Sequence, residues 1–328
     1  MKLANKLFGL VCISYEKELD NTYKDDSYLE DILTKISIII KQIENKDKIL
    51  YINQKKDELE SIIELESIKS DFFAIVSHEF RTPVNIIISI AQLLISDIEG
   101  KNTNINNAKI TEYLKSLKRN AYRLLRLVNN IVDTAKISNN SYDLKLENYN
   151  IISILENITM STVRFADEKK RNIVFDTDQE DVILACDVDK IERIMLNLIS
   201  NAIKFSDFDT DIEIKINTNF DLNRLFISVK NYGKAIEECD KNRIFGRFTQ
   251  TDKLFIRKNE GSGIGLFLVK AFVEMHNGKI HIENIENATQ LTFYLPIDII
   301  EEECVCNPMI DENDTLEKCN IEFSDINI

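Results

Sequence analysis

The chain has 328 residues, of which 44% are hydrophobic, and this is enough for two domains of ordinary size. Its 55 acidic residues outnumber its 41 basic residues, so the phosphates of nucleic acids and of anionic lipids should repel it. The early apolar run at residues 7–13 is shorter than the ~20 residues of a membrane-spanning helix and precedes no signal-cleavage site, so we expect no membrane span and a cytoplasmic location.

The six cysteines are scattered along the chain and lack the spacing of a small disulfide-linked domain, so we expect reduced thiols. Three of them, Cys304, Cys306 and Cys319, share the C-terminal tail. No histidine accompanies these three, and three thiolates leave a tetrahedral metal site incomplete, which disfavours metal binding there.

The first two thirds of the chain should consist of long helices, because most of its glycines lie between residues 233 and 278. Residues 1–28 show no pattern that assigns a role. From Leu29 to Leu50, apolar residues recur at steps of three and four, which predicts a coiled-coil helix over residues 29–68.

A helical hairpin is predicted over residues 69–139. Two amphipathic stretches, 59–94 and 110–135, flank a turn rich in asparagine. Each hairpin offers only one apolar stripe, so we expect two copies of the chain to pair as a four-helix bundle in a homodimer.

Residues 147–297 alternate helices with short β-rich runs, which predicts an α/β sandwich with a mixed sheet covered by helices on one face. The last part, residues 298–328, has ten acidic residues and one lysine, and we expect a mostly disordered, solvated tail. The strands expected in the sandwich cover residues 172–175, 211–217, 225–229, 279–282 and 291–295.

His78 is the first candidate for chemistry. At 100° per residue it lies about 200° around its helix from the apolar Val76, so it should face solvent. A lone exposed histidine is commonly an ordinary surface residue, although a neutral imidazole is also a competent nucleophile near pH 7. Its surroundings, SHEFRTP at residues 77–83, resemble the phosphoacceptor box of the sensor histidine kinase family. Glu79 is then placed to orient the imidazole, and Thr82, one helical turn on, to hold a water for the reverse hydrolysis.

A second constellation consists of Asn197, Asn201 and Lys204, which are spaced to share one side of a helix predicted over residues 190–205. Such a polar stripe is often only a solvated face. Its sequence, NLISNAIKF, resembles the N box of the same family, which implies that Asn201 binds Mg²⁺ and that Asn197 and Lys204 address the phosphates of ATP. Amide oxygens suit a hard cation, and an ammonium group suits phosphate.

A glycine-rich turn, GSGIGL at residues 261–266, opens the next helix and can present backbone N–H groups to an anion. Alone it is a weak motif, because its spacing matches neither GxGxxG nor a P-loop. It resembles the second glycine box of the family. Phe245 begins a run that resembles the phenylalanine box, and residues 249–260 would form the lid over the nucleotide. The glycines with implied nucleotide contacts are Gly261, Gly263 and Gly265.

The first glycine box departs from the family pattern. Residues 231–236, NYGKAI, stand where the family commonly has DxGxGI. Asn231 can still accept a hydrogen bond from the adenine amino group, but more weakly than a carboxylate. Gly233 is retained, whereas Ala235 replaces the second glycine and would clash if that position needs a positive φ.

The resemblance covers residues 69–297 and implies an ATP-dependent protein-histidine kinase. It would autophosphorylate His78 from Mg-ATP and pass the phosphoryl group to the aspartate of a response-regulator receiver domain. One alternative is a degenerate kinase that only binds regulators, favoured by Asn231 and Ala235, and another is a net phosphatase using Thr82. A third, a chaperone-type or repair ATPase, is disfavoured by the phosphoacceptor box. The remaining histidines, His276 and His281, should be structural or surface residues.

Overall fold

The computed structural model divides the chain into two compact units, Met1–Phe72 and Phe73–Ile328. No helix in the described part of the chain is long and apolar enough to cross a bilayer, although most of the apolar run at residues 7–13 lies outside that part. The structure describes residues 2–3, 6–7, 26–99, 107–139, 141–241, 243–246, 263–301, 304–306 and 312–326.

The first unit contains two short antiparallel strands, β1 (Lys2–Leu3) and β2 (Lys6–Leu7), and the start of helix α1 (Asp26–Glu99). α1 is one helix of 74 residues, so the predicted coiled-coil segment and the first hairpin helix are continuous. Apolar side chains of its first part are uncovered in the single chain, since Ile43 is 55% exposed and Leu50 is 53% exposed. A coiled coil over residues 29–68 stays a prediction.

The second unit begins with the helical hairpin, which consists of the end of α1 and helix α2 (Asn107–Ser138). α1 continues through Pro83 although proline cannot donate to the helix ladder. Two ion pairs join the helices, from Arg123 to Glu79 at 3.2 Å and from Lys109 to Asp97 at 3.6 Å. The predicted helical hairpin is therefore confirmed.

A mixed sheet follows, as predicted. Strands β4 and β6 pair in parallel, and the other neighbours pair antiparallel. Each strand extends beyond the run expected from the sequence. The sheet order is β4 (Asn172–Thr177), β6 (Asp211–Asn219), β7 (Arg224–Tyr232), β9 (Ala288–Pro296) and β8 (Lys279–Ile285). A second, two-stranded sheet of β3 (Glu147–Asn150) and β5 (Ile183–Cys186) was not expected.

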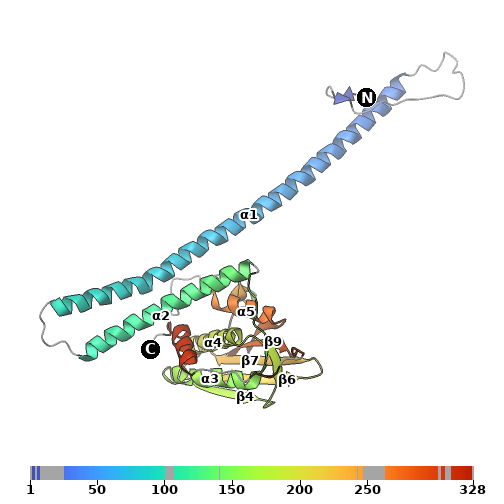
Figure 1. The fold of residues 1–328 in the computed structure, drawn as a ribbon. Helices are drawn as coiled ribbons and strands as arrows, with labels where there is room; N and C mark the ends of the chain where they lie inside the picture. Colours follow the sequence, from blue (N-terminus) through green and yellow to red (C-terminus); the bar gives the residue numbers. More distant parts are fainter. Residues whose placement is uncertain are drawn as a thin grey trace. The chain divides into compact units, whose positions relative to one another are not determined.

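Three helices cover one face of the mixed sheet: α3 (Ile151–Asp167), α4 (Val188–Phe205) and α5 (Gly265–Met275) (Figure 1). The helices cover this face because it is apolar. On β6, for example, Ile212, Ile214 and Ile216 alternate with polar residues and are at most 1% exposed. Burying such a side chain stabilises the fold by about 1.5–3 kcal/mol. The helices add Ile151, Ile154, Leu155, Ile191, Ile194, Met195, Leu198, Ile199 and Phe272 to this core.

The structure of the acidic tail differs from the disordered segment expected from the sequence. Residues 312–326 are not disordered: helix α6 (Glu312–Glu322) and the turn after it pack against α2, α3 and α4. Cys319, Phe323 and Ile326 are at most 5% exposed, and the Phe323 ring stacks on Phe165 with centroids 4.7 Å apart. These three residues follow the i, i+4, i+7 spacing that predicts an apolar helical face, although Phe323 and Ile326 lie in the turn after α6; the high charge of the tail obscures this signal in the sequence.

Candidate active site

His78 lies on the exposed side of α1, as the helical period predicts. The hydroxyl of Thr82 donates a hydrogen bond of 3.4 Å to the backbone carbonyl of His78, so the two residues share one face of the helix. The role of Thr82 in holding a water stays a prediction.

The carboxylate of Glu79 is held by α2. Its Oε2 lies 3.2 Å from Nη2 of Arg123, and both side chains are at most 15% exposed. Such an enclosed pair is screened less by solvent than a surface pair. Glu79 therefore helps to fix the hairpin next to His78, and its role in orienting the imidazole stays a prediction.

The start of α4 is fixed by a capping residue and a buried histidine. The Asp187 side chain accepts a hydrogen bond of 3.3 Å from the backbone N–H of Lys190, which caps the helix. The backbone N–H of Asp187 donates to Nε2 of His276 at 3.1 Å, and Nδ1 of His276 lies 2.7 Å from the carbonyl of Phe272. Burial lowers the pKa of His276, so the ring is a neutral structural element. His281, by contrast, is exposed on β8.

Asn197 and Gly265, which belong to two separate sequence motifs, meet in the structure. Asn197 is 2% exposed, and its Nδ2 donates a hydrogen bond of 3.0 Å to the carbonyl of Arg193. A Cβ atom on Gly265 would lie only 2.4 Å from Oδ1 of Asn197. Glycine therefore keeps the start of α5 close to the amide side of α4. Asn201, one turn beyond Asn197, is half-buried.

Lys204 contacts the C-terminal turn. Its Nζ lies 2.6 Å from Oδ2 of Asp325, and only 9% of the Lys204 side chain is exposed. Burial lowers the pKa of Lys204, and the charge of Asp325 offsets part of that effect. Asp325 carries no signal for this contact in the sequence, because nothing in its local pattern connects it to a residue 121 positions earlier.

The first glycine box lies at the end of β7. Asn231 is 9% exposed and stands opposite the buried Thr289 of β9. A Cβ atom on Gly233 would lie 2.1 Å from the carbonyl oxygen of Phe205, so this close approach of β7 to the end of α4 requires glycine. Ala235 is not among the described residues with positive φ, so its methyl group fits the backbone.

The second glycine box forms a turn that leads into helix α5, as its sequence predicts. Gly263 has a φ of 67°, in the region that favours glycine, and Gly265 is the first residue of α5. Gly265 and Leu266 open α5, and the backbone N–H groups at the start of a helix can receive an anion. Phe245 lies in a short 3₁₀ turn and packs against the core. Gly261 and the predicted lid over residues 249–260 lie outside the described residues.

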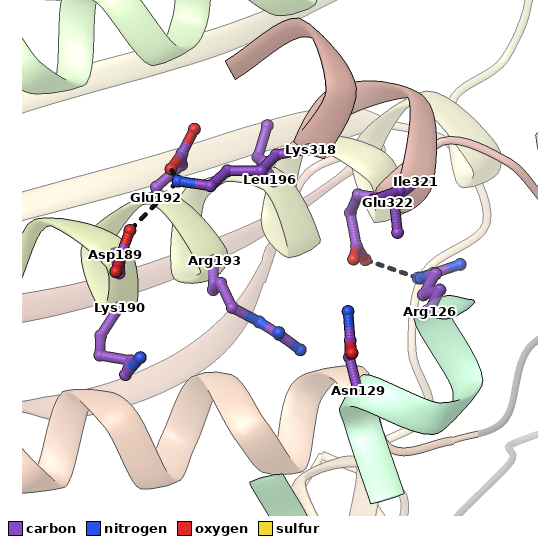
Figure 2. A pocket seen from close by; sticks show the side chains of 10 residues that line it. All are labelled: Arg126, Asn129, Asp189, Lys190, Glu192, Arg193, Leu196, Lys318, Ile321 and Glu322. Carbon is purple, nitrogen blue, oxygen red and sulfur yellow. Dashed lines mark hydrogen bonds and ion pairs between the residues drawn. The ribbon is translucent and has the colours of Figure 1, made fainter. Parts of the chain in front are cut away.

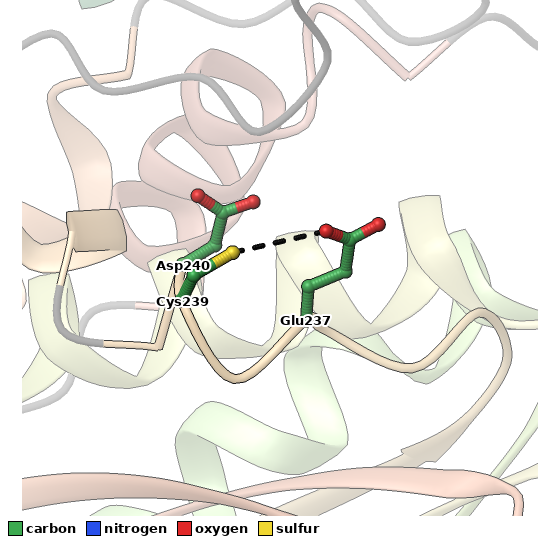
Figure 3. Close-up of side chains that lie close together, drawn as sticks. All are labelled: Glu237, Cys239 and Asp240. Carbon is green, nitrogen blue, oxygen red and sulfur yellow. Dashed lines mark hydrogen bonds between the residues drawn. The ribbon is translucent and has the colours of Figure 1, made fainter.

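Figure 3 shows a separate group, Glu237, Cys239 and Asp240, whose candidate ligand atoms lie within 4.8 Å of one another. The thiol of Cys239 donates to Glu237 at 3.8 Å, and Asp240 pairs with Arg243 at 3.3 Å. The Cys239 thiol and the Asp240 carboxylate already have local partners, and we assign no metal to this group.

A cleft of about 240 Å³ lies between α2, α4 and α6 (Figure 2). Three ion pairs link its walls: Lys318 pairs with Glu192 at 2.7 Å and with Asp189 at 3.1 Å, and Arg126 pairs with Glu322 at 2.7 Å. None of the predicted site residues lines this cleft. Its lining residues are Arg126, Asn129, Asp189, Lys190, Glu192, Arg193, Leu196, Lys318, Ile321 and Glu322.

Two family models match the chain. Residues 186–299 match the histidine kinase-, DNA gyrase B- and HSP90-like ATPase, and residues 68–140 match the His Kinase A (phospho-acceptor) domain. All predicted site residues fall inside these two ranges, whereas α6 falls outside them.

Similar curated proteins include hybrid signal transduction histidine kinase D of Dictyostelium discoideum, 35% identical over 260 residues that cover 76% of this chain and 16% of that protein. Sensor histidine kinase WalK of Bacillus subtilis is 32% identical over 231 residues, which cover 70% of this chain and 36% of that protein. The chain thus spans well under half the length of these relatives. A solved structure, histidine kinase ThkA in complex with response regulator protein TrrA, has a similar fold, with a TM-score of 0.51 and 24% identity over 71% of this chain and 63% of that chain.

Proposed function

Because the chain belongs to the two-component sensor histidine kinase family, we propose that it uses Mg-ATP to phosphorylate its own His78. One combined observation supports this proposal. His78 is exposed on the hairpin, and in the same chain α4 and α5 bring Asn197 against Gly265. An acceptor imidazole and a phosphate-binding helix start in one chain are what an autophosphorylating enzyme requires.

The nucleotide is proposed to bind between α4 and the start of α5. The N–H groups of Gly265 and Leu266 at the start of α5 donate to phosphate oxygens, and the missing side chain at Gly265 lets this helix start lie against Asn197 of α4. Asn197 and Lys204 are the further phosphate contacts, and Asn231 accepts a hydrogen bond from the adenine amino group. Asn201 is the proposed Mg²⁺ ligand, and the bound ion would neutralise phosphate charge.

The proposed reaction is an in-line displacement. An unprotonated ring nitrogen of His78 attacks the γ-phosphorus, the N–P bond forms, the P–O bond to the leaving group breaks, and ADP departs. The neighbouring Glu79 favours the positive charge that develops on the imidazole. The phosphoryl group then passes to a carboxylate oxygen of a receiver-domain aspartate. This partner class is supported by the similarity to ThkA, which was solved with a response regulator.

A homodimer is part of the proposal. On α1, Val84 and Ile88 are 38% and 48% exposed, and on α2, Leu125 and Val128 are 42% and 44% exposed. Two apolar stripes at i, i+4 and i, i+3 spacing fit the inside of a four-helix bundle. A cytoplasmic location would supply the ATP that this reaction consumes.

The test is incubation of the full chain with Mg²⁺ and ATP radiolabelled on the γ-phosphate. We expect an acid-labile, base-stable label that the His78→Gln substitution abolishes, while ATP binding measured by calorimetry is unchanged. The matched control is His281→Gln, which replaces an exposed histidine on β8 and should keep the label. A His78→Gln protein that still acquires the label would refute the assignment.

A further inference from the structure

Two basic residues from different elements share one carboxylate of the tail. Oδ2 of Asp325 lies 2.5 Å from Nη1 of Arg126 on α2 and 2.6 Å from Nζ of Lys204 on α4. Nη2 of Arg126 also lies 2.7 Å from Oε1 of Glu322. All four side chains are at most 13% exposed. The tail therefore joins the hairpin to the α/β sandwich of residues 147–296, from β3 to β9, which we call the ATPase domain, through charges that are shielded from water.

We propose that Arg126 and Lys204 form a carboxylate-binding site, that residues 312–326 are its intramolecular ligand, and that this contact holds the enzyme inactive. While Asp325 occupies the ammonium group of Lys204, that group is closed to the phosphates of ATP. The inference rests on the proposed function, because only there is Lys204 a phosphate contact.

The charges of this site favour an ionised carboxylate. Burial alone would raise the pKa of Asp325, but Arg126 and Lys204 more than offset that effect and hold the pKa below its usual value. Asp325 is therefore an anion at neutral pH. An anion bound to Lys204 competes directly with any phosphate oxygen that needs the same N–H donors.

Apolar contacts explain how the segment stays in place. Cys319 and Phe323 are buried against the ATPase domain, and the Phe323 ring stacks on Phe165 of α3. Next to Cys319 on α6, Lys318 adds an ion pair with Glu192 of α4 at 2.7 Å (Figure 2). The segment thus contacts α4 near both ends of that helix, at Glu192 and at Lys204.

Two polar atoms in the contact between the tail and the Arg126–Lys204 site lack hydrogen bonds, so this contact can be broken at a lower free-energy cost. Oδ1 of Asp325 and Nε of Arg126 are buried without a hydrogen-bond partner among the described residues. Unsatisfied buried polar atoms disfavour the closed form. The triphosphate of ATP carries more negative charge than one carboxylate, so Mg-ATP can displace Asp325 from Lys204.

The experiment compares wild type with Asp325→Asn, which keeps the shape of the side chain and removes its charge. The matched control is Glu317→Gln, the loss of one negative charge from an exposed position on α6 of the same segment. We expect Asp325→Asn to bind Mg-ATP about tenfold more tightly if the closed form outnumbers the open form by about ten to one. Its rate of autophosphorylation at low ATP should rise by a similar factor, and Glu317→Gln should match wild type.

Cys319 provides a second readout that does not depend on catalysis. Its thiol is fully buried, and burial raises its pKa to about 11, so it should react slowly with a thiol reagent in the closed form. Peptide mass spectrometry separates it from the other cysteines. We expect Asp325→Asn, and also Mg-ATP added to wild type, to accelerate labelling of Cys319.

The outcomes separate the two proposals. Unchanged Cys319 labelling in Asp325→Asn would show that the ionic contacts do not hold the segment and would overturn the inference. Faster Cys319 labelling with unchanged ATP affinity would overturn it as well, because the segment would then open without affecting the nucleotide. Absence of ATP binding in both proteins would refute the proposed function, and Cys319 labelling would still report on the segment.

Discussion

The hairpin and the ATPase domain use their apolar residues in opposite ways. In the ATPase domain, Ile194 and Phe272 are at most 1% exposed, because three helices close over one sheet face. In the hairpin, Ile88 and Leu125 are 48% and 42% exposed in the single chain. The first region completes its core within one chain, whereas the second has an apolar face that a second copy can cover.

The largest expected effect is a loss of stability in the ATPase domain of the Phe272→Ala variant. This ring lies in the core of the ATPase domain, and its removal should lower the free energy of unfolding of that domain by about 3–5 kcal/mol, since a cavity remains. Urea denaturation followed by circular dichroism measures the loss. The matched control is Phe220→Ala, because Phe220 is 65% exposed and its removal should change stability by less than about 0.5 kcal/mol. Equal losses in both variants would contradict the assigned core.

Leu125→Asp tests whether a second copy of the chain covers the apolar face of the hairpin. A charge on the apolar stripe should separate the proposed dimer, because a buried unpaired carboxylate is costly, while the ATPase domain keeps its unfolding midpoint. Light scattering over a range of protein concentrations measures the change in mass. Glu112→Gln on the exposed side of α2 serves as the control. A wild-type chain that stays monomeric at every concentration would contradict the bundle.

Periodicity predicted most of the fold because most of its elements have one buried face. It predicts the hairpin helices, while short β-rich runs predict all five strands of the mixed sheet, and the motifs of α4 and α5 contain the two residues that meet, Asn197 and Gly265. The contact from Lys204 to Asp325 could not be predicted, because it depends on how the tail folds back. The apolar spacing of Cys319 and Phe323 was readable, but ten acidic residues outweighed it.

A smaller effect is expected from pH, through His276. Burial lowers its pKa from 6.5, so the unfolded chain takes up this proton first as the pH falls. The stability contributed by the neutral ring is therefore complete above pH 6.5 and is lost as the pH drops below it. Protonation would also turn Nε2 from an acceptor into a donor facing the N–H of Asp187. Denaturation at about pH 7.5, 6.5 and 5.5 should show a decline that His276→Gln reduces. Identical slopes in the two proteins would rule out this residue as the cause.

The smallest expected effect concerns Asn231→Asp, which restores the carboxylate common in the family. A charged acceptor for the adenine amino group is worth about 1 kcal/mol more than an amide oxygen, or roughly fivefold in affinity. Asn231 is only 9% exposed, so the cost of desolvating the new carboxylate should offset part of this gain. Calorimetry should therefore show ATP binding that is unchanged or slightly tighter.

Asn201→Ala provides the contrast, since loss of the proposed Mg²⁺ ligand should weaken Mg-dependent binding far more than any change at the adenine end. The titrations are best repeated in the Asp325→Asn background, so that a closed tail is not mistaken for a defective nucleotide site. If ATP bound neither to the chain with its native Asn231 nor to the Asn231→Asp variant, even in that background, the active-kinase proposal would fail. A regulator-binding module built on the same hairpin would then account better for the chain, because its exposed His78 face would persist without nucleotide chemistry.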